Sequence, residues 1–350
     1  MEASRALSTR VPVAVLGATG YTGVELLRLL VRHPAVELSF LSSEQYRERR
    51  AADIYPFLDG IVDTVLRAPE PAEVAAAADV VFTALPHGAA APLVKELLHR
   101  GRRVIDLSAD FRLRDPALYA RWYGPHGAPG LLTRAVYGLP ELNRELIRGA
   151  SLVACPGCYP TGALLGLVPL ARAGWLRQPV IIDAKSGTTG AGRGAKLEQL
   201  FAEVNENFRP YAIGEHRHGP EIEQELHAAG GSSAVLFVPH LLPVSRGILS
   251  TMYVRVAGGR PPLEAVFRDA YAGEPFVVLR AEGPPPELRE VRGTNRCVIG
   301  WRWDASSEQA VVITAIDNLG KGASGQAVQC LNVMLGLSET MGLEAPALVP

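Results

Sequence analysis

Short apolar runs alternate with amphipathic segments along the first third of the chain. Val11–Leu16 is a short apolar run of the kind that forms a buried parallel strand. It is followed by Tyr21–Val31, in which apolar residues recur at the three- and four-residue spacing of a helix. The alternation continues, with strands expected at Val36–Leu41, Asp79–Leu85 and Val104–Ser108 and a helix at Ala89–His99. Strands that alternate with helices predict βαβ units and a parallel sheet.

After about residue 150 the pattern changes to longer strands with fewer helices between them. A strand at Leu152–Cys155 and a helix at Thr161–Ala173 are expected first. Later segments predict the strands Val180–Asp183, Val235–Pro239, Ile248–Val256, Cys297–Trp303 and Gln309–Ile316. Gly283–Arg292 is expected to be a loop, and the last clear element is a helix at Ala323–Leu335. This half of the chain therefore predicts a mixed or antiparallel sheet.

Length, charge and cysteine content narrow the class of protein. At roughly 150 residues per domain, 350 residues correspond to two or three domains. A formal net charge of −1 argues against a nucleic-acid partner, which a basic excess would indicate. The longest stretch without Asp, Glu, Lys or Arg, Gly149–Ala171, contains prolines that favour a strand, a turn and a helix over a membrane span. No signal peptide is evident, and the four cysteines are too few for a disulfide scaffold, so we expect a cytoplasmic protein with no membrane partner.

A glycine-rich turn follows the first predicted strand and opens the first predicted helix. Its sequence, GATGYTG, has the spacing GxxGxxG. Early glycines permit a tight turn and a close approach of the backbone to a pyrophosphate, and the helix N-terminus supplies N–H groups. The context predicts a dinucleotide site formed by Gly17, Thr19, Gly20, Tyr21, Thr22 and Gly23.

The end of the second predicted strand bears on which dinucleotide binds. An NAD site usually places Asp or Glu there to bind the ribose 2′-hydroxyl. Here the strand ends at Ser42 and Ser43, with Arg47 nearby and Glu44 as a competing carboxylate. Hydroxyls and an arginine suit a 2′-phosphate, so we favour NADP(H) over NAD(H).

Cys158 is the candidate nucleophile. It lies in the segment CPGCYPT, where Pro160 suits the first turn of a helix and places Cys158 just before the N-terminus of that helix. The helix dipole favours a thiolate, which is the nucleophile in acyl transfer. A redox pair with Cys155 and a small buried cysteine are the alternatives, and no second CxxC is present to complete a zinc site.

Two histidines offer a base for this thiol. His216 and His218 lie in GEHRHGPE, and a neutral imidazole titrates near physiological pH. Side chains two residues apart point to the same side only in an extended segment. The residues themselves do not decide which histidine is the base, and no third ligand at metal spacing is present, so no metal is expected.

Two other segments carry groups suited to anionic ligands. Ser186–Arg193 follows a predicted strand and approaches the glycine spacing of a Walker A loop, but its Lys-Ser/Thr pair is replaced by Arg193-Gly194. Such a loop still suits a phosphate or a cofactor. Arg112 follows the carboxyl end of a strand in the first domain, where it could pair with a substrate carboxylate.

Taken together, these residues closely resemble the N-acetyl-gamma-glutamyl-phosphate reductase family in its bacterial single-enzyme form. The matching segments are GATGYTG (17–23), ALPHG (84–88), DLSADFR (106–112), PGCYPTG (156–162), SGTTGAGR (186–193), HRHGPEI (216–222) and AIDNLGKG (315–322). The resemblance implies an α/β fold of the semialdehyde and glyceraldehyde-phosphate dehydrogenase type. A Rossmann-type NADP-binding domain would comprise residues 1–155 and 321–350, and an α+β catalytic and dimerisation domain residues 156–320.

The resemblance also implies an activity. Cys158 would attack the acyl phosphate of N-acetyl-glutamyl 5-phosphate, and NADPH would reduce the thioester to the 5-semialdehyde. His216 would be the acid/base, with His218 as the competing choice. The other implied site residues are Arg112, Tyr211 and Arg193 for the substrate, and Pro86, Ser186, Gly187 and Asn318 for the cofactor. A homodimer or homotetramer acting on a small-molecule substrate is expected.

One departure and two alternatives stay open. The family usually has Asn where this chain has Cys155, which either fills a strand position or closes a reversible disulfide with Cys158. A related enzyme of lysine biosynthesis, which reduces a carrier-bound aminoadipyl phosphate, lacks the Tyr-Pro pair that follows Cys158 here. A non-catalytic NADP-binding sensor on the same fold is the alternative of another class.

Overall fold

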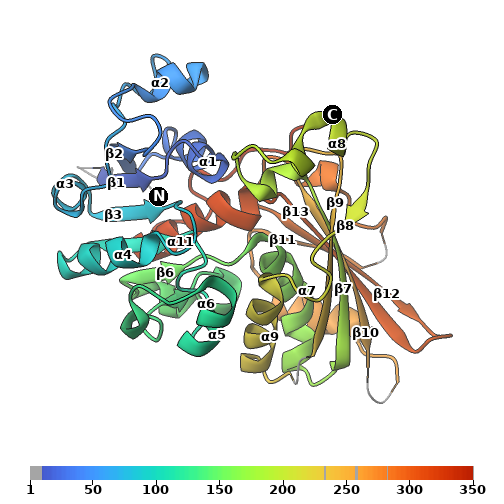
Figure 1. Ribbon diagram of the computed structural model, residues 1–350. Helices are drawn as coiled ribbons and strands as arrows, with labels where there is room; N and C mark the ends of the chain where they lie inside the picture. Colours follow the sequence, from blue (N-terminus) through green and yellow to red (C-terminus); the bar gives the residue numbers. More distant parts are fainter. Residues whose placement is uncertain (1–9, 232–233, 257–258, 282, 350) are drawn as a thin grey trace, which may run out of the picture. The chain divides into compact units, whose positions relative to one another are not determined.

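The structure is a computed structural model that describes residues 10–231, 234–256, 259–281 and 283–349 (Figure 1). The chain divides into two compact units. Unit 1 runs to Cys155 and resumes over Ala327–Leu343, and unit 2 comprises Pro156–Gln326 and the residues from Glu344. The sequence analysis placed the return to the first domain at residue 321. The division instead falls six residues later, inside the last helix, and assigns the final residues to unit 2.

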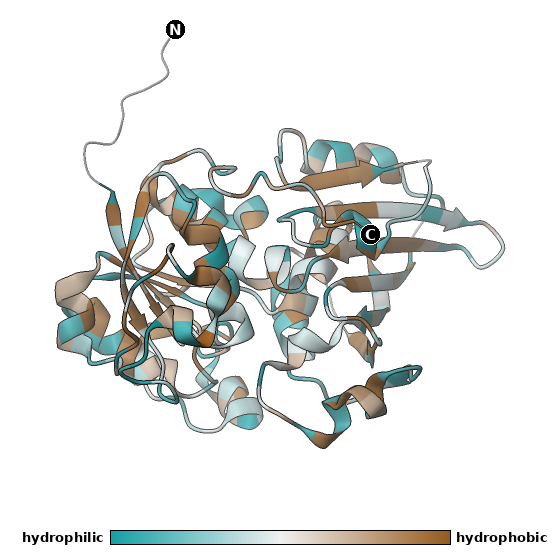
Figure 2. Ribbon diagram, turned by 90° about the horizontal axis from the view of Figure 1, so that it is seen from above, coloured by the Kyte–Doolittle hydropathy of each residue, from teal (hydrophilic) through white to brown (hydrophobic). Residues whose placement is uncertain are grey.

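Unit 1 is built on a parallel sheet whose described strands follow the order β2-β1-β3-β4-β6-β5. Their bounds are β1 (Val11–Leu16), β2 (Val36–Ser42), β3 (Val80–Thr83), β4 (Arg103–Asp106), β5 (Val136–Tyr137) and β6 (Leu152–Ala154). The central strands are fully buried, as continuous apolar runs between two helical layers must be, and Figure 2 colours them mainly as hydrophobic.

Helices connect and cover these parallel strands. They are α1 (Tyr21–Leu30), α2 (Ala51–Ile54), α3 (Pro71–Ala77), α4 (Ala90–His99), α5 (Pro116–Tyr123) and α6 (Pro140–Arg148). A π-helical turn, Gly320–Ser324, leads into the last helix, α11 (Gly325–Leu335). The unit 1 part of α11 is fixed by long-range contacts, including a 2.9 Å hydrogen bond between Asn332 Oδ1 and His33 Nε2.

Unit 2 is built on a mixed sheet with the strand order β11-β12-β13-β10-β7-β9-β8. The bounds are β7 (Arg177–Ser186), β8 (Arg209–Pro210), β9 (Val235–Leu241), β10 (Ile248–Arg255), β11 (Val277–Arg280), β12 (Cys297–Asp304) and β13 (Gln309–Ile316). Its described helices are α7 (Cys158–Arg172), α8 (Phe201–Val204), α9 (His218–Ala228) and α10 (Leu263–Ala270). Successive strands pair antiparallel from β7 to β10, from β10 to β13 and from β13 to β12. This agrees with the mixed sheet expected from the sequence.

α7 lies against one face of this sheet, with α9 beside it (Figure 1). Nearly every residue of α7 is buried, because the helix is apolar on all sides and is covered by both the sheet and α9. The opposite face of the sheet is partly exposed and carries Ile181, Leu236 and Tyr253. The sheet therefore has one packed face and one face left for other contacts.

The sequence pattern does not predict α9, whose first turn contains Gly219 and Pro220. Proline in a first turn lacks only an N–H that has no intrahelical partner, so the helix tolerates it. Elsewhere the predicted strands were located within a few residues, and β13 exactly. Within the described part of the chain, no helix is both long and apolar enough to cross a membrane.

Candidate active site

The glycine turn of unit 1 lies between β1 and α1, as the sequence predicts. Gly17 adopts a φ of +82°, and a Cβ there would come within 2.3 Å of the Ala84 carbonyl oxygen. Gly23 faces the turn just as closely, since its Cβ would lie 2.2 Å from the Gly17 carbonyl oxygen. Gly20 instead has nearly open space where a Cβ would project. Gly17 and Gly23 are therefore needed for packing, and Gly20 leaves room beside the turn.

The start of α1 fits a dinucleotide phosphate. Gly20 is its N-cap and supplies no side-chain cap, and no acidic residue lies in the first turn, which begins with Tyr21 and Thr22. Backbone N–H groups at such a helix start favour an anion. Pro86, a further predicted cofactor residue, lies exposed in the segment after β3.

Hydroxyl groups from β2 contact this turn. Ser42 Oγ accepts a hydrogen bond from the Gly17 N–H at 3.1 Å, and the Ser43 and Thr19 hydroxyls lie 2.8 Å apart. The carboxyl end of β2 is thus joined to the glycine turn through the serines that the sequence singles out. Arg47, expected to help bind the cofactor, forms an ion pair with the neighbouring Glu44.

Arg112 has a structural role that the sequence did not suggest. Its Nε donates to the Cys155 carbonyl oxygen at 2.7 Å, and Nη2 donates to the Leu107 carbonyl oxygen at 2.8 Å. The side chain is buried, and it ties the loop after β4 to the end of β6. Its predicted contact with a substrate carboxylate remains a prediction.

In unit 2, Cys158 is the first residue of α7, and Gly157 is the N-cap. The Gly157 N–H donates to Glu221 Oε1 at 2.8 Å, so a carboxylate buried in α9 holds the turn that precedes the thiol. Gly322 approaches from the π-helical turn, where a Cβ would lie 2.9 Å from Cys158 Cβ. The half-buried cysteine therefore lies in a closely packed turn at a helix N-terminus, as the first residue of the helix rather than just before it as predicted.

The two histidines lie together at the start of α9. Their ring centroids are 4.7 Å apart, and His216 Nδ1 accepts a hydrogen bond from the His218 backbone N–H at 3.1 Å. His218 is the nearer of the two to the nucleophile's turn, because a Cβ on Gly157 would lie only 2.5 Å from its Nε2. Burial, reinforced by the charge of Arg217, lowers the pKa of His216 to about 4.

Two tyrosines border the histidines. The Tyr159 and Tyr211 hydroxyls are 2.9 Å apart, and the Tyr159 ring packs edge-on against both imidazoles. Burial raises the pKa of Tyr211 to about 12, with the charge of Cys158 adding to the effect and the hydrogen bond from Tyr159 opposing it. Tyr211, predicted to bind substrate, therefore lies in the same cluster as the histidines and close to the nucleophile.

The glycine-rich segment after β7 is held by Asn318. Asn318 Oδ1 accepts from the Gly247 N–H at 2.7 Å, and its Nδ2 donates to Thr189 Oγ1 at 2.9 Å. Gly187 packs so closely on the neighbouring loop that a Cβ would lie 2.8 Å from the Ser245 carbonyl oxygen. Ser186 is buried, with its hydroxyl donating to the Gly187 carbonyl oxygen, whereas Arg193 is exposed.

The cysteines are free thiols throughout, including Cys155 and Cys158. Cys155 is fully buried in unit 1, and burial together with a hydrogen bond to Cys330 raises its thiol pKa. A thiol with a raised pKa in an apolar site has little thiolate, so it reacts slowly. Cys155 lies one residue past the end of β6, so it does not fill a strand position as expected, and its environment is that of a small buried thiol.

Sequence reasoning missed Glu221 and Tyr159 as site residues. Both lie inside segments that were singled out, PGCYPTG and HRHGPEI, but neither has a spacing that predicts its contact. In the sequence, Glu221 is an acidic residue in a segment that forms a helical turn. An acidic residue there usually indicates a solvent-exposed face of the helix.

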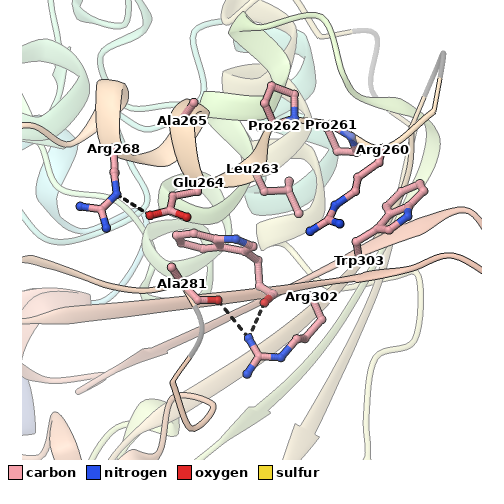
Figure 3. Close-up of a pocket in the computed structure, with 11 residues that line it drawn as sticks. Arg260, Pro261, Pro262, Leu263, Glu264, Ala265, Arg268, Ala281, Arg302 and Trp303 are labelled. Atoms are coloured by element: carbon pink, nitrogen blue, oxygen red, sulfur yellow. Dashed lines mark hydrogen bonds and ion pairs between the residues drawn. The ribbon is translucent and has the colours of Figure 1, made fainter.

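A cavity of about 800 Å³ lies elsewhere in unit 2, between α10 and the strand β12 (Figure 3). Its described lining residues are Arg260, Pro261, Pro262, Leu263, Glu264, Ala265, Arg268, Ala281, Trp301, Arg302 and Trp303. None of the predicted site residues is among them. In Figure 3, Arg268 pairs with Glu264 and Arg302 donates to the Ala281 carbonyl oxygen, so two of the three arginines in the described lining are already engaged.

Comparisons with known proteins place the chain in a family. Residues 12–150 match the semialdehyde dehydrogenase NAD-binding domain, and residues 158–318 match the semialdehyde dehydrogenase dimerisation domain. A protein of Geobacter metallireducens named N-acetyl-gamma-glutamyl-phosphate reductase is 52% identical over 97% of this chain and 99% of its own length. The chain belongs to the N-acetyl-gamma-glutamyl-phosphate reductase family.

Other members support this family assignment, and solved structures share the fold. Proteins of the same name from Moorella thermoacetica and Pseudomonas aeruginosa are each 51% identical over 97% of this chain and all of their own length. Among solved structures, aspartate semialdehyde dehydrogenase II from Vibrio cholerae, complexed with ASA, has a TM-score of 0.73 at 19% identity, covering 94% of this chain and 99% of that one. Aspartate semialdehyde dehydrogenase from Candida albicans, with NADP, has a TM-score of 0.71 at 16% identity, covering 93% of this chain and 99% of that one. These two structures share the fold of the family, a Rossmann-like parallel sheet combined with a mixed sheet.

Proposed function

We propose that this chain uses NADPH to reduce N-acetyl-L-glutamyl 5-phosphate to N-acetyl-L-glutamate 5-semialdehyde and phosphate, the third step of arginine biosynthesis. The family members named for this activity are about half identical to it over nearly their whole length. The observation that carries the proposal is the position of Cys158 at the N-terminus of α7, with His218 packed against the preceding residue.

The chemistry follows from this turn. The Cys158 thiolate attacks the acyl carbon, the bond from carbon to the phosphate oxygen breaks, and inorganic phosphate leaves. The first turn of α7 stabilises the thiolate, both before the attack and when the thioester later releases it. The glycine turn would hold the dinucleotide, and the bound dinucleotide would supply the hydride that reduces the thioester to the aldehyde.

His218 is our choice of acid/base, although the family resemblance implies His216 with His218 as the competing choice. His218 Nε2 lies against Gly157, the residue that precedes Cys158, and a base for the thiol proton is needed at this turn. His216 is neutral at physiological pH because its pKa lies near 4, and it accepts the backbone N–H of His218. His216 therefore holds the first residue of α9 in place, and His218 takes up and returns the proton.

The remaining predicted contacts are part of the same proposal. Tyr211 adjoins the histidine cluster and would hydrogen-bond the substrate, with Arg193 and Arg112 meeting its anionic groups. Asn318, which joins the two loops beside β7, would lie near the nicotinamide. The proposed preference for NADPH over NADH rests on the hydroxyls of Ser42 and Ser43 and on a nearby arginine side chain.

The oligomer is proposed as a homodimer or homotetramer assembled through unit 2. The region that matches a dimerisation domain is 158–318, and the exposed face of its sheet carries Ile181, Leu236 and Tyr253. Cytoplasmic location remains the expectation from the sequence.

A reverse assay with matched variants tests the function. N-acetyl-glutamate semialdehyde, NADP⁺ and phosphate are supplied, and NADPH formation is followed for the wild type, Cys158→Ala and Cys297→Ala. Loss of the nucleophile should lower kcat at least about 1,000-fold. Cys297→Ala makes the same change at a buried thiol in β12 and should retain most of the activity.

The same assay separates the alternatives. A wild type that prefers the aminoadipate homologue, or that acts on neither substrate, would contradict the proposed substrate. Activity that persists in Cys158→Ala would contradict the thioester mechanism. A non-catalytic sensor would bind NADP⁺ without catalysing the phosphate-dependent reduction of NADP⁺ to NADPH.

A further inference from the structure

The carboxyl end of β2 presents hydroxyl groups and no acidic side chain of its own. The Ser42 hydroxyl contacts the Gly17 N–H, and the Ser43 hydroxyl contacts Thr19, so both adjoin the turn where the dinucleotide would bind. A 2′-phosphate at this position needs a cation as well, because hydroxyls alone do not offset its two negative charges.

The arginines that follow β2 in sequence are already engaged. Arg47 pairs with Glu44, so together the two contribute no net charge. Arg50 Nη2 lies 2.5 Å from Asp63 and 3.1 Å from Asp59. Arg49 lies over the ring of Tyr46, 6.0 Å from its centroid. Recruiting Arg47 or Arg50 to a phosphate would require breaking a carboxylate pair.

Arg67 reaches the same place from a different part of the chain. It forms a parallel bridge with Ser42, its N–H donates to the Leu41 carbonyl oxygen at 3.0 Å, and its carbonyl accepts from the Ser43 N–H at 3.1 Å. Residues paired across a sheet project their side chains from the same face. Arg67 therefore leaves the backbone beside Ser42, on the face that carries the Ser42 hydroxyl.

The Arg67 side chain makes only weak contacts with its neighbours. Its guanidinium carbon lies 6.0 Å from the centroid of the Phe40 ring, two residues before Ser42 on the same face. Its carboxylate neighbour, Glu73, is at the 4.0 Å limit of an ion pair, and both side chains are more than half exposed, at 62% and 58%. At 4.0 Å this exposed pair is too long for a hydrogen bond, unlike the close pairs of Arg47 and Arg50, so the guanidinium can leave Glu73 for a phosphate at small cost.

We propose that Arg67 is the residue that selects NADPH over NADH, by pairing with the 2′-phosphate next to the Ser42 and Ser43 hydroxyls. This rests on the proposed NADPH-dependent function and assigns its cofactor specificity to a residue outside the segment that follows β2. Arg47 has a different role in this arrangement, because it neutralises Glu44, whose free carboxylate would repel the phosphate.

Equilibrium binding of NADP⁺ and NAD⁺ tests the assignment without depending on turnover. Calorimetric titrations of the wild type, Arg67→Gln, Arg67→Lys and Arg49→Gln give the ratio of the two dissociation constants for each protein. Arg67→Gln should weaken NADP⁺ binding by about 10- to 100-fold and NAD⁺ binding by less than about threefold. Arg67→Lys, which keeps the charge, should recover part of the preference, and Arg49→Gln should leave the ratio at its wild-type value.

Salt dependence supplies a readout that a merely structural role would not change. Wild-type affinity for NADP⁺ should fall more steeply with salt than affinity for NAD⁺, and Arg67→Gln should remove the difference. Equal losses for both dinucleotides in Arg67→Gln, or an unchanged ratio, would overturn the assignment. So would a wild type that binds both equally, whereas loss of reductase activity with the binding pattern intact would overturn only the proposed reaction.

Discussion

At the scale of single residues, the histidine cluster shows how burial assigns different roles to two identical side chains. His216 is enclosed by Tyr159, Tyr211 and Phe237, and this burial lowers its pKa to about 4. A neutral imidazole can accept the His218 N–H, whereas a protonated one could not. The local structure around the proposed base therefore depends on His216 staying uncharged.

The depressed pKa of His216 predicts a pH-dependent stability. Between pH 6.5 and about 4 the unfolded chain binds a proton at this position and the folded chain does not, so the free energy of unfolding falls as the pH falls. The contribution of this one group is at most roughly 3 kcal/mol. Urea unfolding at pH 7.5 and pH 5 should show a larger loss of stability in the wild type than in His216→Asn, and equal losses would contradict the prediction.

At the scale of elements, the site is formed where the starts of two helices meet. α7 begins with Cys158 and α9 begins with His218, and Glu221 in the first turn of α9 accepts the N–H of the α7 N-cap. Because each helix fixes the first turn of the other, the spacing between thiol and imidazole depends on the absence of a side chain at Gly157.

Gly157→Ala should therefore damage catalysis without damaging the fold. Its backbone is extended, at φ −61° and ψ 151°, which alanine adopts readily, but the added Cβ would meet His218 Nε2 at 2.5 Å. Displacing the base by about 1 Å should lower kcat on the order of 100-fold. Gly219→Ala is the matched control, since its Cβ would meet nothing within 4 Å. Steady-state kinetics and NADP⁺ titration of both variants check this, and a fully active Gly157→Ala would show that the imidazole is not needed there.

At the scale of the whole molecule, the exposed face of the unit 2 sheet is the proposed contact between copies of the chain. Ile181 pairs with Leu236 on one side and with Tyr253 on the other, which places three partly exposed apolar side chains in a row across β9, β7 and β10. Exposed apolar groups in a row typically mark an interface.

A charge introduced into this row should dissociate the oligomer. Ile181→Arg places a cation where an interface would bury it unpaired, which costs several kcal/mol. Leu146→Arg makes the same kind of change at an exposed apolar residue of α6 in unit 1 and should leave the assembly intact. Light scattering after size exclusion gives the molar mass of each variant. If Ile181→Arg keeps the wild-type mass, this face is not the interface.

The sequence by itself determined the features that depend on neighbouring residues. The period of apolar positions located most of the strands, with β1 and β13 matching exactly, but not β5, β8 or β11. The proline and glycine spacing around Cys158 placed it next to a helix start. The same local reasoning placed the glycine turn between β1 and α1. These features follow from backbone geometry, and they need no knowledge of what packs on them.

Only the tertiary structure decided the features that join distant residues. Glu221 holds a turn 64 residues before it, His218 rather than His216 faces that turn, and Arg67 is bridged to Ser42, which lies 25 positions earlier in the chain. No periodicity in the chain encodes such pairs, because each arises when a sheet or a pair of helices assembles and brings separate segments within hydrogen-bonding distance. The chemistry suggested by the motifs could thus be read locally, but the residues that orient it were determined by packing.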